Sequence, residues 1–347
     1  MARSLFRYFA TALYGMLLIS CSRTASPVRV VNLYVWSNYI PVSVLHDFEK
    51  DTGIRINYDT YDSNEALLEK MQSGLADYDV IVPSDYMVGI LKRQELLQKL
   101  DRNRIPNVAN AGTRFMNPPY DPGNVYSVPF LWSTTGIGYD KSKVTETVKS
   151  WSILWDPKFA GRILMLDDMR ECFAVALKWK GHSLNSTDPG QLAEAKQLLL
   201  EQKTLLKGYN STTFDDLLLS GDTWITHAWS GQIALVAEDN HNLSYVVPEE
   251  GGPLAVENFC IPGTSRHREE AHILINYLLD AKVGAKITNL SHYPNTNEAA
   301  KKFIKPEILR NPVIYPDEAT LARCELISDI GPAYRVMDRY WTEIKSQ

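Results

Sequence analysis

The stretch NLYVWSNYIPVSVLHDFEKDTGIRINYDTY, residues 32–61, decides the fold class of this chain. It begins with an apolar, β-branched run that is typical of a strand, and a second strand pattern starts at Ile54. Between them, Pro41 opens a helical segment that Gly53 ends. The apolar residues of this segment share one helical face: Val44, Leu45 and Phe48. A strand, a helix and a second strand in so short a stretch predict a parallel α/β sheet.

The same alternation continues outward along the chain. We expect a second helix that is capped by Asn64 and closed by Gly74, and a long loop at 105–124 where both patterns fail. Farther elements are the strands 78–82, 125–132, 135–139, 162–166, 223–228, 243–247 and 254–261 and the helices 171–180, 191–202, 231–237 and 265–279. Ser265 caps the last of these helices, and a second sheet is expected to begin near residue 138.

Length and charge narrow the class of protein. A chain of 347 residues exceeds what one hydrophobic core usually serves, so we expect two lobes in a monomer. With 45% hydrophobic residues the composition is that of a globular protein. The formal net charge of −5 makes nucleic acid a poor partner and favours cationic ligands.

The N-terminus predicts export. Arg3 and Arg7 precede a short apolar run at 9–19, and Leu18-Ile19-Ser20-Cys21 resembles a bacterial lipobox. We therefore expect a signal peptide at 1–20, lipidation of Cys21 and a tether at 21–27 that holds the protein to a membrane. The alternative is an ordinary secretory signal that is cut near Ser20. Either cleavage leaves an extracytoplasmic chain.

The remaining motifs exclude several kinds of chemistry. Cys172, Cys260 and Cys324 are an odd number and lie far apart, so buried thiols are expected in place of a disulfide framework. There is no Walker A loop, no GxSxG and no HExxH, and Gly136-Ile137-Gly138 lacks the third glycine of a dinucleotide fingerprint. We expect no metal and no cofactor.

Unusual side chains follow several predicted strands, where the loops of a parallel sheet gather and ligands bind. They are Trp36–Tyr39 after the first strand, Ser84, Asp85 and Tyr86 after the third, Asp167 and Asp168 after the strand 162–166, and Trp229 after the strand 223–228. Because these strand ends come from both predicted lobes, they indicate one cleft between the lobes.

Asp168 and Glu171 lie three residues apart at a strand-to-helix junction, on one side of the first helical turn. They are either ligand-binding acids or a capping box in which Asp168 caps the helix and Glu171 reaches back. Asp167 could itself be the cap, which would free the other two.

Four aromatic residues share the strand ends: Trp36, Tyr39, Tyr86 and Trp229. Each taken alone is more often a core residue than a ligand contact. Aromatic faces attract cations by about 0.5 to 2 kcal/mol per contact, and carboxylates neutralise the same charge at closer range. Aromatic and acidic residues together favour an organic cation with an aliphatic body.

Six motifs carry a family resemblance. They are LYVWSNYIP, YDVIVPSDYMV, SWSILWDPKFAG, LDDMREC, EEGG and HYPNTNEAAK. In this order, from about residue 30 to 345, the chain resembles the periplasmic spermidine/putrescine-binding proteins of polyamine ABC transporters, the PotD/PotF type.

The resemblance implies a type II periplasmic-binding-protein fold, with two α/β lobes and a ligand cleft at a hinge. Lobe 1 would comprise 28–134 plus 256–301, and lobe 2 would comprise 137–253 plus 304–347. The protein would be a periplasmic lipoprotein that passes a polyamine to an ABC permease. The implied ligand-binding residues are Trp36, Ser37, Asn38, Tyr39, Ser84, Asp85, Tyr86, Asp168, Glu171, Trp229, Glu257 and Tyr293.

Four residues, at three places in the chain, depart from the family pattern. Ala255 and Glu257 stand where the family usually has tryptophan and aspartate, Ile327 replaces an expected glutamine, and Asn38 replaces an acid. The choice between putrescine and spermidine is therefore open. The alternatives are another small cation such as a basic amino acid, for which Arg170 is the nearby carboxylate partner, and a hydrolase that uses Asp168 and Glu171 as acid and base.

Overall fold

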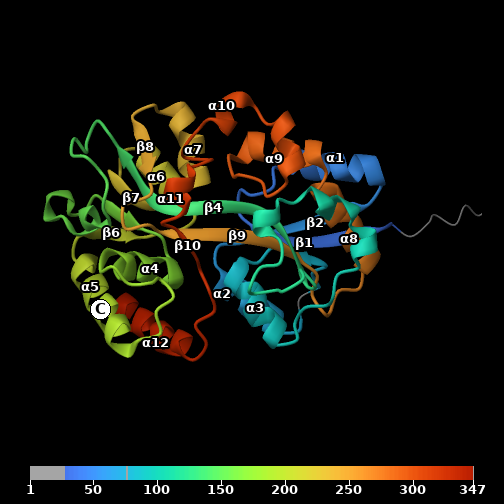
Figure 1. Ribbon diagram of the computed structural model, residues 1–347, viewed down its shortest axis with the longest axis horizontal. Coiled ribbons are helices and arrows are strands. Elements are labelled where there is room, and N and C mark those ends of the chain that lie inside the picture. Colours follow the sequence, from blue (N-terminus) through green and yellow to red (C-terminus); the bar gives the residue numbers. More distant parts are fainter. Residues whose placement is uncertain (1–27, 76, 347) are drawn as a thin grey trace, which may run out of the picture.

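The computed structural model describes residues 28–75 and 77–346, so the predicted signal peptide 1–20, the lipidation site Cys21 and the tether 21–27 lie outside the described residues. Its centre is one twisted sheet in the order β2-β1-β3-β9-β4-β7-β5-β6, with β8 and β10 as side branches. Helices cover both faces of each half of this sheet (Figure 1). The expected α/β fold is confirmed.

The first half of the molecule is built on three parallel strands: β1 (Val30–Trp36), β2 (Arg55–Tyr61) and β3 (Val80–Ile81). The helices that follow them are α1 (Val42–Thr52), α2 (Asn64–Gln72) and α3 (Asp85–Arg93). The predicted helical face of Val44, Leu45 and Phe48 is buried, and Gly53 ends α1 in a left-handed conformation with φ of 70°. The strand–helix–strand prediction holds here.

One long strand, β4 (Ser127–Asp140), joins the two halves. Its residues 127–134 pair with β9 (Pro253–Cys260), and its residues 135–140 pair with β7 (Ile225–Trp229) and β8 (Leu243–Val246). The prediction of two short strands was wrong, whereas the second sheet expected near residue 138 corresponds to the part that starts at Thr135 and, among the described strands, is joined to the first through β4 alone. Ser133 and Thr134 continue the strand because their backbone groups pair with β9.

The second half repeats the parallel arrangement with β5 (Ile163–Met165), β6 (Leu206–Tyr209) and β7. Its helices are α4 (Met169–Trp179), α5 (Pro189–Lys203), α6 (Phe214–Leu219), α7 (Ser230–Asp239) and the C-terminal α12 (Ala333–Ser346). Each half has its own core. Phe48 and Phe259 belong to the first, and Trp151 and Phe173 to the second.

The remaining elements complete the two halves. Helices α8 (Arg268–Leu278) and α9 (Ala281–Ser291) lie with the first half, and α10 (Pro306–Leu309), α11 (Glu318–Leu321) and β10 (Glu325–Leu326) lead back across the molecule to α12 (Figure 1). Short 3-10 helices occupy Arg102–Arg104, Pro106–Asn110, Thr113–Phe115, Trp151–Trp155, Pro157–Phe159 and Glu298–Phe303.

Two predicted caps were wrong. The cap of α2 is Ser63, whose Oγ accepts a hydrogen bond from the Ala66 N–H at 3.1 Å, and Asn64 is already inside the helix. Ser265 lies ahead of α8 and donates to Asp79 Oδ1 at 2.8 Å. At α2 the neighbouring Ser63 takes the capping position, whereas α8 begins after His267, which makes no side-chain capping hydrogen bond.

Among the described residues, the thiols are unpaired, with Cys172 and Cys260 buried and Cys324 half-buried. The burial prediction is therefore confirmed for two of the three. No described helix combines the length and apolarity that a membrane crossing requires. The described part of the chain also contains no cluster of three or more potential metal ligands.

Candidate ligand-binding site

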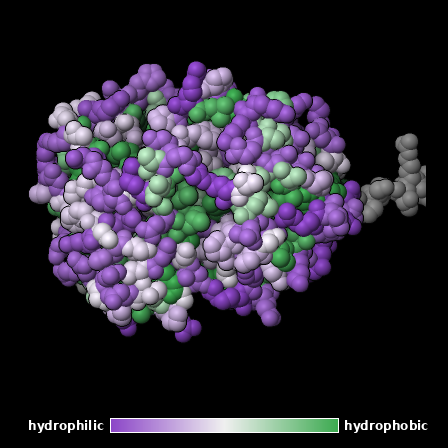
Figure 2. Space-filling model, in the orientation of Figure 1, coloured by the Kyte–Doolittle hydropathy of each residue, from purple (hydrophilic) through white to green (hydrophobic). Residues whose placement is uncertain are grey.

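The ends of five strands meet between the two halves and enclose a small cavity of about 20 Å³. Its wall consists of Trp36, Tyr39, Asn64, Ser84, Asp85, Tyr86, Ser133, Asp168, Glu171, Trp229, Ala255, Glu257 and Ile327. Nine of these were predicted from strand ends or from the resemblance. On the outer surface, hydrophobic side chains gather along the line where the halves meet (Figure 2).

The wall of the first half is centred on the carboxyl group of Glu257 in β9. Trp36, the last residue of β1, donates its indole N–H to Glu257 Oε2 at 2.9 Å. Ser84, at the N-terminus of α3, places its hydroxyl 3.0 Å from both carboxyl oxygens. Both oxygens of Glu257 therefore have a protein donor, which fixes this acid at the cavity.

The wall of the second half is formed by the first turn of α4. Asp168 is its N-cap and accepts the Glu171 N–H at 3.0 Å. Oε1 of Glu171 accepts from Thr135 Oγ1 at 3.0 Å and from the Trp229 indole N–H at 3.1 Å. Its Oε2 is buried and has no hydrogen-bond partner among the described residues. The nearest basic atom is His227 Nε2 at 3.8 Å.

This geometry resolves the two interpretations of the acidic pair. Asp168 is the cap, yet its side chain also lines the cavity. Glu171 does not reach back to the cap as in a capping box, because its carboxyl group is held by Thr135 and Trp229. The helix N-terminus thus presents two carboxyl groups to the cavity, where its dipole and free N–H groups offset part of the cost of burying their ionised form.

The aromatic side chains bring the two walls together. The rings of Trp36 and Trp229, one from each half, meet edge to face with centroids 6.0 Å apart. The ring centroids of Tyr39 and Tyr293 lie 4.5 Å apart. The Tyr293 hydroxyl donates to Gln232 Oε1 at 3.0 Å. These rings provide flat apolar faces beside the buried acids.

Gly231, at the start of α7, makes room for Tyr293. A Cβ atom at this position would lie 2.8 Å from the tyrosine ring, so a larger residue would displace it. Tyr293 itself lies behind Tyr39 and does not line the cavity.

Burial raises the pKa of every cavity acid. The pKa of Asp85 rises to about 8 and that of Glu171 to about 7. Burial likewise raises the pKa of Asp168 and Glu257 well above the usual range, and neighbouring acids add to both shifts. Burial lowers the pKa of His227 to about 3, so this histidine is neutral beside Glu171. The site therefore disfavours its own negative charge until a cation arrives.

The other predicted residues lie around this centre. Ser37 and Asn38 form the turn after β1 and do not line the cavity; Ser37 Oγ donates to Asp62 Oδ1 at 3.0 Å, and Asn38 has φ of 64°. Asp85 and Tyr86 open α3 and line the cavity. Arg170 lies over the Tyr86 ring, 5.4 Å from its centroid.

Comparison with known proteins gives the family. A family model described as bacterial extracellular solute-binding protein matches residues 43–314. The chain belongs to this family of solute-binding proteins.

Three relatives show how far the similarity extends. The solute-binding protein is 35% identical to the spermidine/putrescine-binding periplasmic protein 1 of Haemophilus influenzae, over 93% of this chain and 91% of the relative. It is 32% identical to the putrescine/cadaverine-binding protein of Pseudomonas aeruginosa, over 94% and 97%. The solved structure of the TpPotD lipoprotein of Treponema pallidum matches with a TM-score of 0.83 and 30% identity, over 92% and 100%. The predicted resemblance to periplasmic polyamine-binding proteins is confirmed.

Sequence reasoning missed several supporting residues of this solute-binding protein. Asn64 was interpreted as a cap, but its Nδ2 donates to Ser84 Oγ at 3.0 Å. Thr135 lies inside a strand whose centre the sequence interpreted as a break, and His227 is one apolar-flanked histidine among seven. Only the strand-end rule could have pointed to His227, because it lies two residues before Trp229.

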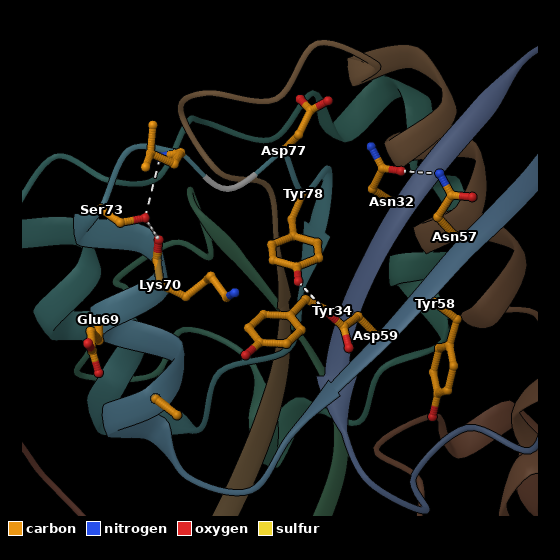
Figure 3. A pocket seen from close by; sticks show the side chains of 12 residues that line it. Asn32, Tyr34, Asn57, Tyr58, Asp59, Glu69, Lys70, Ser73, Asp77 and Tyr78 are labelled. Carbon is orange, nitrogen blue, oxygen red and sulfur yellow. Dashed lines mark hydrogen bonds between the residues drawn. The ribbon is translucent and has the colours of Figure 1, made fainter.

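A larger hollow lies on the outside of the first half, between α2 and the β1–β2 edge, with a volume of about 900 Å³ (Figure 3). The rings of Tyr34 and Tyr78 stack at its floor with centroids 4.3 Å apart, and the Tyr78 hydroxyl donates to Asp59 at 2.6 Å. None of the predicted site residues lines this hollow. The solute-binding protein therefore has its convergent acids and indoles in the small cavity between the two halves, and not in this larger hollow.

Proposed function

We propose that this protein captures a linear polyamine, putrescine or spermidine, outside the cytoplasmic membrane and delivers it to the permease of an ABC transporter. The observation that carries this proposal is the cavity wall, in which indole and phenol rings adjoin four buried carboxyl groups. Relatives that are named for spermidine, putrescine and cadaverine binding support the same class of ligand.

In the proposed mechanism, Asp168, Glu171 and Glu257 bind the ammonium groups. Trp36 and Trp229, together with Tyr39 and Tyr86, surround the methylene chain, and Ser84 and Asp85 supply further polar contacts. Tyr293 supports Tyr39 from behind, and Ser37 and Asn38 form the turn between Trp36 and Tyr39. A cavity of about 20 Å³ has room for about one water molecule and is far too small for a polyamine. The halves must therefore separate to admit a polyamine and close on it afterwards.

We further propose that the moving bodies are the lobes expected from the sequence, 28–134 plus 256–301 and 137–253 plus 304–347. Support comes from β4, which exchanges β9 for β7 and β8 as its partners between Thr134 and Thr135. A hinge at this point would leave both sets of ladder hydrogen bonds intact.

Isothermal titration calorimetry of the purified full-length protein tests the ligand class. We expect saturable heat with putrescine or spermidine at micromolar protein concentration. The absence of heat with putrescine, spermidine and spermine would refute the proposal. Arginine and lysine in competition with the polyamine test the alternative of a basic amino acid.

The structure offers little support for that alternative. Arg170, the candidate partner for an amino-acid carboxylate, donates from Nη1 to the Ser328 carbonyl at 2.8 Å and from Nη2 to Asn185 Oδ1 at 3.1 Å. It does not line the cavity. For the hydrolase alternative, Asp168 already serves as a helix cap, and turnover of a glycan or peptide library would be required to revive it.

We also propose that lipidation of Cys21 anchors the protein to a bacterial membrane, with the chain as a monomer in the periplasm. The support is the lipobox sequence and the similarity to a Treponema protein that is itself called a lipoprotein. Cys21→Ser should release the protein from the membrane fraction into the soluble periplasmic fraction. An unchanged membrane fraction would contradict lipid anchoring and leave the ligand proposal untouched.

A further inference from the structure

The buried charges of the cavity do not balance. Four acids line it with relative exposures of 0% for Asp85, 6% for Asp168, 4% for Glu171 and 3% for Glu257. Arg170, 1% exposed, is the buried cation that interacts with Asp85, Asp168 and Glu171. When all five groups are ionised, the cluster carries three more negative than positive charges.

Asp85 is the acid that the fold explains least. Its Oδ1 accepts the Tyr86 N–H at 2.8 Å, but its Oδ2 is buried and has no hydrogen-bond partner in the described part of the chain. Oε2 of Glu171 is likewise buried without a hydrogen-bond partner among the described residues. A buried, unpartnered carboxylate oxygen costs free energy, so each is expected to meet a donor when the ligand is bound.

The four acids form one electrostatic group. After burial, Glu65 and Glu171 are the groups that raise the pKa of Asp168 most. Asp85 raises the pKa of Glu171 and also that of Glu257. Each acid therefore raises the pKa of a neighbouring acid: Glu171 acts on Asp168, and Asp85 acts on Glu171 and Glu257.

The neighbouring titratable groups do not change this count near neutral pH. His227 is neutral, because burial lowers its pKa to about 3. Burial raises the pKa of the hydroxyl groups of Tyr39, Tyr61, Tyr86 and Tyr293 well above their usual value, so they are neutral too. Glu65 acts on Asp168 from outside the cavity wall, is only half-buried and accepts the Tyr334 hydroxyl at 2.8 Å, so solvent screens its charge and it is not one of the buried charges.

We propose that the cavity is matched in charge to a trivalent polyamine, and that a divalent polyamine binds only with one more carboxyl group protonated. This inference rests on the function proposed above. A trication compensates the three excess negative charges of Asp85, Asp168, Glu171, Glu257 and Arg170. A dication leaves one buried negative charge, and a buried group without a counter-charge takes up a proton instead.

The proton comes from the buffer, and Asp85 is the group that holds it. Asp85 is fully buried, and its Oδ2 lacks a donor that would stabilise a carboxylate. Protonation turns that oxygen into a hydroxyl donor and removes the uncompensated charge. The putrescine complex therefore contains about one proton more than the spermidine complex.

The pH dependence of selectivity follows directly. Both polyamines keep their ammonium groups between about pH 6 and about pH 7.5, because aliphatic amines have pKa values near about 10. The ratio of spermidine to putrescine affinity should rise with pH in this range, by up to about tenfold per pH unit for one proton.

Calorimetry in buffers of different ionisation enthalpy tests the proposal on the full-length protein. Titrations with spermidine and with putrescine at about pH 7 give the protons exchanged per binding event. We expect the two counts to differ by about one, with more protons retained on putrescine binding. Equal counts with two tightly bound polyamines would overturn this inference and leave the proposed function standing. No heat with either would overturn both.

Asp85→Asn tests the assignment, since asparagine has nearly the same shape and lowers the excess negative charge by one. We expect the difference in proton count to disappear and the spermidine to putrescine affinity ratio to fall about tenfold or more. Asp167→Asn is the matched control, because Asp167 follows the same strand as Asp168 but is exposed and paired with Lys345 at 2.7 Å. The wild-type proton counts decide the proposal even if Asp85→Asn does not fold.

Discussion

The two walls of the cavity hold their acids in different ways. In the first half, Glu257 has a donor on each carboxyl oxygen, from Trp36 and Ser84. In the second half, Glu171 has donors on Oε1 alone, and its Oε2 is buried without a partner. The protein thus supplies every hydrogen bond that Glu257 needs, whereas Glu171 has one oxygen that only a ligand can pair with. Removing the two charges should therefore have different consequences.

The largest effect is expected at Asp168, which belongs to the second wall and also caps α4. Asp168→Asn keeps a capping oxygen but removes the charge, and should weaken polyamine binding by about 2 to 5 kcal/mol. Asp168→Ala loses the cap as well and should also lower the melting temperature. Calorimetry and thermal melts separate the two effects. An affinity unchanged in Asp168→Asn would reduce this residue to a cap.

The comparison becomes sharper with Glu171→Gln against Glu257→Gln. In Glu171→Gln the amide oxygen can still accept from Thr135 and Trp229, so stability should hold while affinity falls by about 1.5 to 3 kcal/mol. In Glu257→Gln the amide oxygen can stay on the Trp36 N–H, but the amide nitrogen then forces the Ser84 hydroxyl to accept and leaves its proton without this partner, so the melting temperature should fall more. If both variants lose the same affinity and the same melting temperature, the proposed difference between the walls is wrong.

The pH dependence of stability compares the walls in the ligand-free protein. The pKa values of about 8 for Asp85 and about 7 for Glu171 lie above those of unfolded carboxyls, so the folded state holds more protons. The stability that these groups contribute is fully present below the pKa of unfolded carboxyls, about 4, and is lost from there as the pH rises to about 7 for Glu171 and to about 8 for Asp85, by about 1.4 kcal/mol per pH unit for each group.

Denaturant unfolding between about pH 6.5 and about pH 8 measures the upper part of this loss; Asp85→Asn should flatten it across this range, and Glu171→Gln should flatten it below about pH 7. His227 does not interfere, since it is neutral in both states above its ordinary pKa. A stability that rises across this range would contradict the assigned direction.

The smallest effect concerns a contact between the halves outside the cavity. Tyr334 in α12 donates to Glu65 in α2 at 2.8 Å. Tyr334→Phe removes this hydrogen bond only in the closed form, so it should lower polyamine affinity by about 0.5 to 1.5 kcal/mol, mainly through faster dissociation. Stopped-flow release measures this rate. Tyr340→Phe, on the same helix but without a hydrogen bond to the first half, is the control. Equal release rates would rule out a closing role for Tyr334.

The sequence predicted the local features of this fold better than the long-range ones. Strand and helix patterns are properties of neighbouring residues, so the first strand–helix–strand unit at 32–61 was placed correctly. The continuity of β4 depends on pairing with β9, more than a hundred residues later, and no local pattern encodes it. The break expected at Ser133 and Thr134 was therefore wrong.

The same limit applies to the site. Strand ends located Trp36, Asp168 and Trp229, because topology brings such ends together. The sequence could not show that Thr135 supports Glu171, or that one carboxyl oxygen has no donor. Both observations depend on how side chains of β4 and α4 are oriented toward one another, which no local sequence pattern encodes.

The position of β9 also has a consequence for biogenesis. This strand lies between β3 and β4 in the sheet, yet it is synthesised long after both. A chain that emerges from its N-terminus leaves the edge of β3 without a neighbour until residue 260 arrives. The first half therefore cannot finish folding before most of the polypeptide has been made, because this non-local pairing must wait for it. An exported protein benefits from that delay, since the chain remains threadable until translocation is nearly complete.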